Sequence, residues 1–455
     1  MKPPPKPPRP AGSRSRPRPG RKTRAVLDTL RRHECRNVTF IAHDGGWPIV
    51  WTRARGSHVW DIEGRRYLDL TAAFGVAAAG HAAPAVVRAG QRQMASLLHA
   101  MGDVHPHALK GELARELSRL VFERHQAGPG KTLFTNSGFE AVEAALKTAR
   151  LATGKPGIIA FQGAYHGLGY GALNATHRTH FRDPFRDQLR EFARFLPFPD
   201  VHEPSGASMD AVRSHLPRLL RDHPIGAILV EPIQARGGVR VPPDDFLPFL
   251  RRCADEHGIL LILDEIYTGF GRTGRWFASD RVGVVPDVVC LGKAMTGGFP
   301  LSACVGRASI MDDAWPESTG EAIHTSTFLG HPVGCAMALA QIRELRRLRL
   351  PARAERLGRS LSSNLVTLAR QTSKRGRPAV ARGVGLMQGL ELRTPAGSPD
   401  GPAALGVVRR LLDRGFILLP EGPEGEVIGI TPPLVIPQTE LSRAIRALGE
   451  ELAAC

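Results

Sequence analysis

Three ionisable residues of this 455-residue chain, Glu231, Asp264 and Lys293, stand at the ends of short apolar runs. Such runs are typical of strands buried on both faces of a sheet. Ligands collect at the carboxyl ends of parallel strands, so the three side chains could share one site. A partly desolvated lysine there has a lowered pKa and can attack a carbonyl carbon to form a Schiff base. Singly, Asp264 is more typical of a helix cap and Lys293 of a solvated charge, so only the combination predicts a nucleophilic lysine. The runs are residues 227–230, 259–263 and 288–291.

A lysine of this kind indicates pyridoxal 5'-phosphate as the cofactor, because this aldehyde binds an amine and needs an anion opposite its ring nitrogen. Asp264 can supply that anion. Ser137 and Glu140 have the spacing of a capping box, and Gly138 lets the backbone approach a ligand closely. Free N–H groups and the helix dipole at such a helix start bind phosphate. A simple capped helix fits this segment equally well, so a phosphate site follows only from the combination.

Two other kinds of site find little support. The 17 histidines show neither an HExxH motif nor a Cys/His ligand spacing, so we expect no metal site. The glycines of residues 269–274 follow an acid instead of opening a helix directly after a strand, which argues against a dinucleotide site.

Six motifs, in this order, resemble those of the class-III aminotransferases, such as the ornithine, acetylornithine and 4-aminobutyrate enzymes. The resemblance covers roughly residues 38–450, and its most specific part is the stretch 263–274 with a lysine 29 positions after its aspartate. Each of the other motifs is weak alone. The six are Asn136-Ser137-Gly138, Tyr165-His166-Gly167, Val230-Glu231-Pro-Ile-Gln234, Leu263-Asp264-Glu265-Ile-Tyr-Thr-Gly-Phe-Gly-Arg-Thr-Gly274, Gly292-Lys293-Ala and His324-Thr-Ser-Thr327-Phe.

The resemblance implies an α/β fold, the fold type I of PLP-dependent transferases, and a role for each matching residue. Lys293 becomes the Schiff-base lysine, which also moves the proton. Asp264 becomes the partner of the ring nitrogen, and Ser137 with Gly138 becomes the phosphate loop.

The resemblance also implies contacts around the cofactor ring. Tyr165 would stack on the ring face, where an aromatic side chain gains contact area, and His166 would support that turn. Tyr267 stands where several members have a glutamine near the cofactor's phenolic oxygen. Thr327 resembles the threonine that members donate to the phosphate of the neighbouring subunit's cofactor, so the active site would be complete only in a homodimer.

Two departures from the family pattern concern the substrate. Several amino-acid-using members have a glutamate at the position of Arg236, and at that of Gly429 an arginine that holds the substrate's α-carboxylate. We hypothesise that Arg236 receives a carboxylate of donor or acceptor, the alternative being a solvated loop residue. Gly429 favours a 4-aminobutyrate-like, diamine-like or other ω-amino donor over an α-amino acid. Glu231 either lies near the substrate entrance or bonds neighbouring backbone groups, and both interpretations stay open.

The elements that would position these residues follow from periodicity. Alternation around a Glu-Gly turn predicts a hairpin at residues 60–70. Helical stretches that alternate with apolar runs predict a mostly parallel sheet in a large domain, and a smaller α+β domain follows. We expect a tail (1–22), an N-terminal segment with the hairpin (23–84), a large PLP-binding domain (85–332) and a small C-terminal domain (333–455). The expected helices are residues 85–96, 111–124, 139–151, 335–350 and 352–370, and the expected strands are 157–161, 227–230, 259–263, 288–291, 384–392, 415–419 and 427–430.

The composition, with a net charge of +18 and 42% hydrophobic residues, is compatible with a soluble globular body. Residues 1–22 contain eight bases, eight prolines and no acid, which predicts a disordered tail. A different class of interpretation is nucleic-acid or anionic-surface binding through this tail, but the tail lacks aromatic residues that stack on bases. No apolar run is long enough to span a membrane, and the six scattered cysteines favour reduced thiols in the cytoplasm.

The residues and the resemblance together predict a cytoplasmic, homodimeric, PLP-dependent aminotransferase. It would move an amino group from an amino acid or ω-amino donor to a keto acid or aldehyde in a ping-pong cycle. The alternative is an aminomutase, epimerase or decarboxylase on the same scaffold, because Lys293 and Asp264 serve all of these reactions. A stoichiometric need for a keto acceptor distinguishes them.

Overall fold

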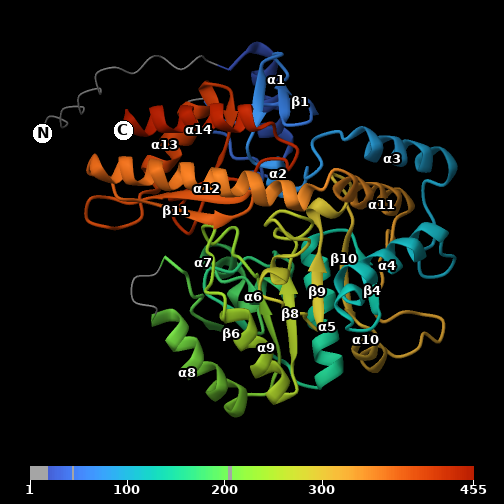
Figure 1. Ribbon diagram of the computed structural model, residues 1–455. Helices are drawn as coiled ribbons and strands as arrows, with labels where there is room; N and C mark the ends of the chain where they lie inside the picture. Colours follow the sequence, from blue (N-terminus) through green and yellow to red (C-terminus); the bar gives the residue numbers. More distant parts are fainter. Residues whose placement is uncertain (1–18, 44–45, 203–206, 455) are drawn as a thin grey trace, which may run out of the picture.

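A seven-stranded sheet, in the order β4-β10-β9-β8-β7-β5-β6, contains the strands that the apolar runs predict. The computed structural model describes residues 19–43, 46–202 and 207–454 (Figure 1). The five neighbouring strands from β9 to β6 are parallel, and β10 runs antiparallel to both β4 and β9. The prediction of a mostly parallel sheet is therefore confirmed. The strands are β4 (Gly130–Thr135), β5 (Gly157–Phe161), β6 (Ala193–Leu196), β7 (Ile225–Val230), β8 (Leu260–Asp264), β9 (Val288–Leu291) and β10 (Ser302–Arg307).

The sequence analysis missed β4, β6 and β10. Strands β4 and β6 lie at the two edges of the sheet and contain exposed residues. Strand β10 is buried but contains Ser302 and Gly306, so it does not form a continuous apolar run. The four strands that were predicted are those covered on both faces.

Helices cover both faces of the sheet, because successive side chains of a strand point to opposite sides. Ala227 and Leu229 of β7 join a buried cluster with the helix α5 (Gly138–Thr153). Ile228 between them joins a second cluster, which includes Phe246 of α9 (Phe246–His257). The remaining helices of this region are α6 (Tyr170–Ala175), α7 (Thr179–Arg182), η2 (Asp183–Gln188), α8 (Ala207–Asp222), η3 (Ala278–Arg281), η4 (Lys293–Met295) and α10 (Ala308–Ala314).

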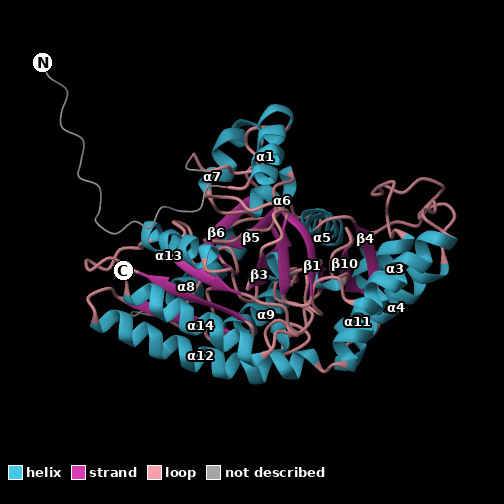
Figure 2. Cartoon of the chain, turned by 90° about the horizontal axis from the view of Figure 1, so that it is seen from above, coloured by secondary structure: helices cyan, strands magenta, loops and turns pink. Residues whose placement is uncertain are grey.

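The C-terminal part contains a four-stranded sheet in the order β11-β12-β15-β14. The segment predicted as one strand, residues 384–392, contains the whole of β12 but begins with the last residue of β11, because Gly385 has a φ of +59° and reverses the chain between these two antiparallel strands. The long helix α12 packs on β11 and β12, and α13 packs on β14 and β15 (Figure 2). The elements are α12 (Leu350–Lys374), β11 (Ala379–Val384), β12 (Met387–Leu392), α13 (Gly401–Asp413), β14 (Leu419–Glu421), β15 (Val427–Ile430) and α14 (Gln438–Ala453).

The predicted hairpin forms, but it is not part of a separate N-terminal unit. Strand β3 pairs in parallel with β13, so the N-terminal segment completes a sheet with the C-terminal part (Figure 1). Residues 1–18 of the predicted tail lie outside the described residues, whereas Arg21 and Lys22, also assigned to that tail, begin helix α1. The elements are α1 (Arg21–His33), β1 (Trp51–Arg55), β2 (His58–Asp61), β3 (Arg66–Asp69) and β13 (Phe416–Ile417).

A further helix begins at the domain boundary expected at residue 332. Helix α11, which we assigned to the small domain, packs mainly against α3 and α4 (Figure 1). Its buried face includes Cys335, Ala338 and Ile342, which belong to the same cluster as Val86 of α3. No helix in the described ranges is both long and apolar enough to cross a membrane. The helices of this group are α2 (Ala72–Gly75), α3 (Pro84–Ser96), α4 (Ala108–Val121), η1 (Glu123–His125) and α11 (Pro332–Arg347).

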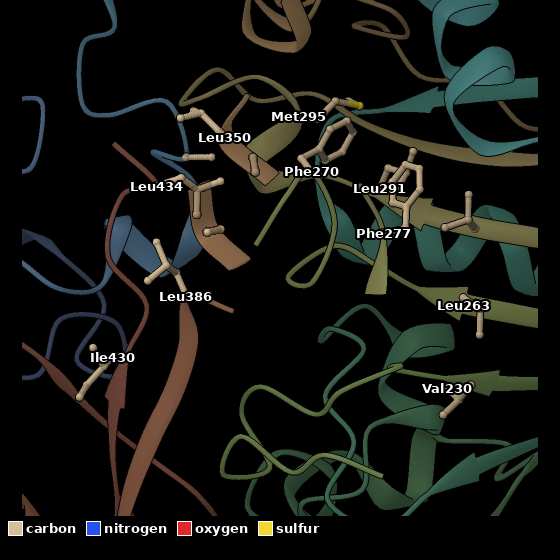
Figure 3. Close-up of a cluster of buried hydrophobic side chains, with 14 of the residues drawn as sticks. Val230, Leu263, Phe270, Phe277, Leu291, Met295, Leu350, Leu386, Ile430 and Leu434 are labelled. Carbon is tan, nitrogen blue, oxygen red and sulfur yellow. The ribbon is translucent and has the colours of Figure 1, made fainter. Parts of the chain in front are cut away.

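One apolar core connects the seven-stranded sheet with the C-terminal part. Figure 3 shows Leu263 and Leu291 of the sheet, then Phe270 and Phe277, and then Leu386 beyond β11 in a single cluster. All five are buried. Packing within this core therefore holds segments of the C-terminal part next to the strand ends of the seven-stranded sheet.

Candidate active site

The carboxyl ends of β7, β8 and β9 meet at a cavity of about 430 Å³. The three strands are parallel neighbours, which brings their ends to one edge of the sheet as expected. Eight of the predicted site residues line the cavity. They are Gly138, Tyr165, His166, Glu231, Arg236, Asp264, Tyr267 and Lys293.

The Asp264 carboxylate at the end of β8 is held in one orientation. Its Oδ2 lies 2.8 Å from Nδ1 of His166, and its Oδ1 accepts the N–H of Ile266 at 3.1 Å. His166 is fixed in turn, because its backbone N–H donates to the hydroxyl of Thr176 at 2.9 Å. His166 and Asp264 are both buried. The ring of His166 therefore orients Asp264, in addition to the turn-supporting role that the resemblance implies.

Lys293 begins the short helix η4 with a φ of +44°, an unusual backbone conformation for a residue other than glycine. Its Nζ lies 4.5 Å from the centroid of the Tyr267 ring. Burial lowers the pKa of Lys293, while Asp264, Glu231 and Glu421 partly restore it. A lowered pKa increases the fraction of neutral amine, which is the nucleophilic form.

The start of α5, where Gly138 lines the cavity, has one buried polar side chain without a partner in the described part of the chain. The Glu140 carboxylate accepts the N–H groups of Asn136 at 2.6 Å and Ser137 at 3.0 Å, which is the Glu140 half of the expected capping box. The hydroxyl of Ser137 is buried and has no hydrogen-bond partner among the described residues. A Cβ atom at Gly138 would lie 3.0 Å from Cδ1 of Ile266, so a side chain there would crowd the cavity wall.

These residues fit pyridoxal phosphate. A buried carboxylate is present for the ring nitrogen, an amine for the aldehyde, and an orphaned hydroxyl at a helix start for the phosphate. His166 Nε2 is a second buried polar atom without a partner in the part of the chain that the structure describes. Unpaired buried polar atoms are rare in folded proteins and usually have a partner that is not part of the chain.

Glu231 bonds neighbouring backbone groups, which is one of the two interpretations, and its place near a substrate entrance stays a prediction. It lines the cavity, and its carboxylate accepts the N–H groups of Tyr165 at 3.0 Å and Ala235 at 3.2 Å. Burial raises the pKa of Glu231 to about 7. The half-buried ring of Tyr165 lies against Phe181, at 5.6 Å between ring centroids, and also borders the cavity.

Arg236 lies in the cavity wall and forms an ion pair, and its binding of a substrate carboxylate stays a hypothesis. Its Nη1 lies 3.5 Å from Oε2 of Glu421, and its guanidinium carbon lies 5.9 Å from the centroid of the Tyr165 ring. Its side chain is 33% exposed, and that of Glu421 only 8%. Arg236 thus comes from the segment after β7, and its acidic partner Glu421 comes from β14.

Thr327 is exposed and is not among the residues that line this cavity. The neighbouring Ser326 hydroxyl lies 3.4 Å from Nδ2 of Asn136, which places this loop near the start of α5. Tyr267 lines the cavity, and its hydroxyl is 3.3 Å from that of Thr431. The expected role of Thr327 therefore requires a second subunit and stays a prediction.

Sequence reasoning missed Glu421 and the hydrogen bond between His166 and Asp264. Glu421 stands in the unremarkable stretch Leu-Pro-Glu-Gly. A usable signal was the arginine at position 236, since a cation on a cavity wall requires a nearby acid. Its partner sits on β14, beside Gly429 of β15, where the sequence shows only the loss of an arginine.

Comparison with known families gives one match that spans most of the chain. The family model described as aminotransferase class-III matches residues 40–452. The match extends over all the motifs on which the resemblance was based, from Asn136 to Phe328.

Similar proteins are named for different substrates. The acetylornithine aminotransferase of Methanopyrus kandleri is 38% identical, over 90% of this chain and 95% of that protein. The 5-aminovalerate aminotransferase of Pseudomonas aeruginosa is 36% identical, over 89% of this chain and 93% of its own length. A solved structure of the Toxoplasma gondii ornithine aminotransferase, with partial occupancy of PLP at its active site, superposes with a TM-score of 0.81 at 29% identity and covers 95% of this chain and 94% of its own.

Proposed function

Because this chain belongs to the class-III aminotransferases, PLP-dependent enzymes that transfer an amino group, we propose a role for each residue of its cavity. When bound, the cofactor supplies an aldehyde for the donor's amino group and a ring that withdraws electrons from the carbon that carried it. Lys293 holds the cofactor through Nζ. Ser137 and Gly138 bind the phosphate, and Tyr165 contacts the ring face.

The observation that carries this proposal is the placement of Lys293, Asp264 and His166 around one cavity. Lys293 Nζ would be the group that takes the proton from the donor's reacting carbon. The Asp264 carboxylate, oriented by His166 at 2.8 Å, pairs with the protonated ring nitrogen. Tyr267 keeps its proton at neutral pH, because burial raises its pKa to about 12, and it packs against the side chain of Lys293.

The test is to trap the lysine. The purified protein is supplied with PLP, reduced with borohydride and digested, and the labelled peptide is identified by mass spectrometry. We expect the label on Lys293 and no label in Lys293→Ala. A label on another lysine, or none, contradicts the proposal. A requirement for a stoichiometric keto acceptor during turnover separates transfer from mutase, epimerase or decarboxylase chemistry.

We further propose an ω-amino donor that carries a remote carboxylate and binds it at Arg236. Arg236 lines the cavity, and position 429, where several family members have a carboxylate-binding arginine, is a glycine. The relatives named above act on different donors by name, so their identity alone does not select one. With 5-aminopentanoate as the donor, we expect Arg236→Ala to raise KM at least tenfold. With pentylamine as the donor, KM should stay within twofold of the wild type. An unchanged KM for every carboxylated donor removes this part of the proposal.

We propose a homodimer with shared sites from exposed large apolar residues, several of which lie at or near the cavity, since exposed apolar surface of this kind often contacts a partner. Two of these residues, Phe139 and Leu168, line the cavity. The segments 97–104 and 322–328 are joined by the rings of His99 and Phe328, 5.4 Å apart. We expect a dimer in sedimentation and weaker PLP binding in Thr327→Ala. The exposed residues are Phe74, Leu97, Leu98, Met101, Val104, Phe139, Leu168, Ile323 and Phe328.

The location we propose is the cytoplasm. The five cysteines in the described part of the chain are free thiols, and four of them are buried. Such thiols are typical of a reducing compartment. Fractionation of the source cells, with PLP-dependent activity as the marker, tests this proposal.

A further inference from the structure

Glu421 is the acid that the structure pairs with Arg236 at the cavity. The distance of 3.5 Å between Nη1 and Oε2 is that of an ion pair without a hydrogen bond, and Oε2 is buried with no hydrogen-bond partner in the described ranges. A buried carboxylate held so loosely is poorly compensated for its lost hydration. The pair can therefore open at little cost if another anion reaches Arg236.

Gly429 gives Glu421 the space it occupies. Strands β14 and β15 are antiparallel neighbours, and Leu419 lies opposite Gly429. A Cβ atom at position 429 would come within 3.0 Å of Cγ of Glu421. The glycine and the glutamate therefore form one arrangement, which puts an acid 3.5 Å from Arg236.

Other charged or titratable groups surround Glu421 on the elements packed against it. Arg178, which precedes α7, already donates to the carbonyl oxygens of Gly422 at 3.0 Å and Pro423 at 2.6 Å. Burial raises the pKa of Glu421 to about 7, although nearby cations oppose this shift. The acid is therefore close to half-protonated at neutral pH. The groups are Arg236 after β7, Lys293 at η4, Arg178, Tyr267 after β8 and Glu426 before β15.

We propose that Glu421 is a specificity-determining residue that competes with the substrate's carboxylate for Arg236, and that it takes up a proton from solvent when that carboxylate binds. This inference rests on the proposed function of Arg236. Two carboxylates at one guanidinium repel each other strongly in a buried site, and protonation of one removes the repulsion. The substrate's carboxylate is ionised at neutral pH, so Glu421 is the group that becomes neutral.

The consequence is a pH dependence limited to carboxylated ligands. Below pH 7, Glu421 is neutral and Arg236 is available. As the pH rises through the pKa of about 7, Glu421 ionises and engages Arg236, so binding of a carboxylate weakens. For one group, the dissociation constant rises about tenfold between pH 6 and pH 8. A ligand of the same length without a charge does not respond.

The experiment measures the binding of pentanoate and pentanamide to the PLP-loaded enzyme by calorimetry. Comparison of phosphate and Tris buffers at pH 8 gives the number of protons taken up, because the two buffers differ in heat of ionisation. We expect uptake of about 0.9 proton per site for pentanoate in the wild type, from a group with a pKa of about 7. Pentanamide should cause none. In Glu421→Gln, pentanoate should bind without proton uptake and with a dissociation constant independent of pH.

The controls separate this inference from the proposed function. Glu424→Gln, an exposed glutamate on the same turn, should behave as the wild type. If pentanoate binding depends on Arg236 but takes up no proton, the role of Arg236 stands and that of Glu421 is refuted. Proton uptake that persists in Glu421→Gln also refutes it. If pentanoate does not bind the wild type at pH 6, both fail, whereas borohydride trapping at Lys293 still tests the catalytic assignment.

Discussion

We predict that Glu265 holds in place the loop that carries Tyr267 and Arg272 beside the cavity. Its carboxylate is fully buried and accepts the N–H groups of Ala278 at 3.0 Å and Ser279 at 2.9 Å, and the Thr268 hydroxyl also donates to it. Three donors from two later segments of the loop thus converge on one side chain. Replacing Glu265 by alanine should open this loop at its base.

The magnitude follows from the groups left behind. Alanine leaves two buried N–H groups without an acceptor, and each costs about 1–3 kcal/mol, for a total of about 2–6 kcal/mol. For a large chain this corresponds to a fall in Tm of roughly 2 °C per kcal/mol, or about 4–12 °C. Glutamine keeps one acceptor oxygen, so Glu265→Gln should lose about half as much.

The assay is thermal unfolding of the PLP-free protein at pH 8, at one scan rate for all variants. Burial raises the pKa of Glu265 to about 7, so the carboxylate is mostly ionised at pH 8 and all its acceptor sites are available. Glu317→Ala, an exposed glutamate, serves as the matched control. Equal Tm values for Glu265→Ala and Glu317→Ala would refute the view that these hydrogen bonds hold the loop.

Three further predictions concern the cavity. His166→Gln removes the bond to Asp264, so PLP affinity should fall about tenfold or more, as measured by absorbance titration; an unchanged affinity would contradict the orienting role. Gly138→Val should crowd Ile266 at the helix start and weaken PLP binding. The Tm of the PLP-free protein should fall by less in Gly138→Val than in Glu265→Ala. A larger fall in Tm in Gly138→Val, with unchanged PLP binding, would show that Gly138 has a structural role only. Glu231 has a folded pKa of about 7, raised from 4.5, so its contribution to stability is complete below pH 4.5 and is lost as the pH rises to 7. The free energy of unfolding of the wild type, minus that of Glu231→Gln, should therefore fall by at most about 3 kcal/mol between these pH values, and a difference that is constant across the range would refute the raised pKa.

The local pattern of the chain was enough to predict the sheet interior and the residues at its edge. Strands β5, β7, β8 and β9 are continuous apolar runs because helices cover them on both sides, and this burial is visible in the sequence itself. The residues that end such runs, Asp264 among them, must then lie at one edge. The strands at the two ends of the strand order, β4 and β6, show no such run, because some of their side chains are exposed.

Contacts between segments that are distant in the sequence could not be predicted from local patterns. His166 meets Asp264 across 98 residues, and β3 pairs with β13 near the opposite end of the chain. Helical periodicity likewise shows that α11 has an apolar face, but not that α3 and α4 cover it. Which charged groups lie at the proposed substrate site could likewise not be predicted, because this depends on the position of β14 relative to the segment after β7.

The sequence by itself determined that Lys293 and Asp264 share a sheet edge, because burial and strand period are properties of neighbouring residues. Only the tertiary structure decided which acid faces Arg236. An ion pair depends on the separation of two side chains carried by different elements, and the packing of the C-terminal strands against the sheet sets that separation.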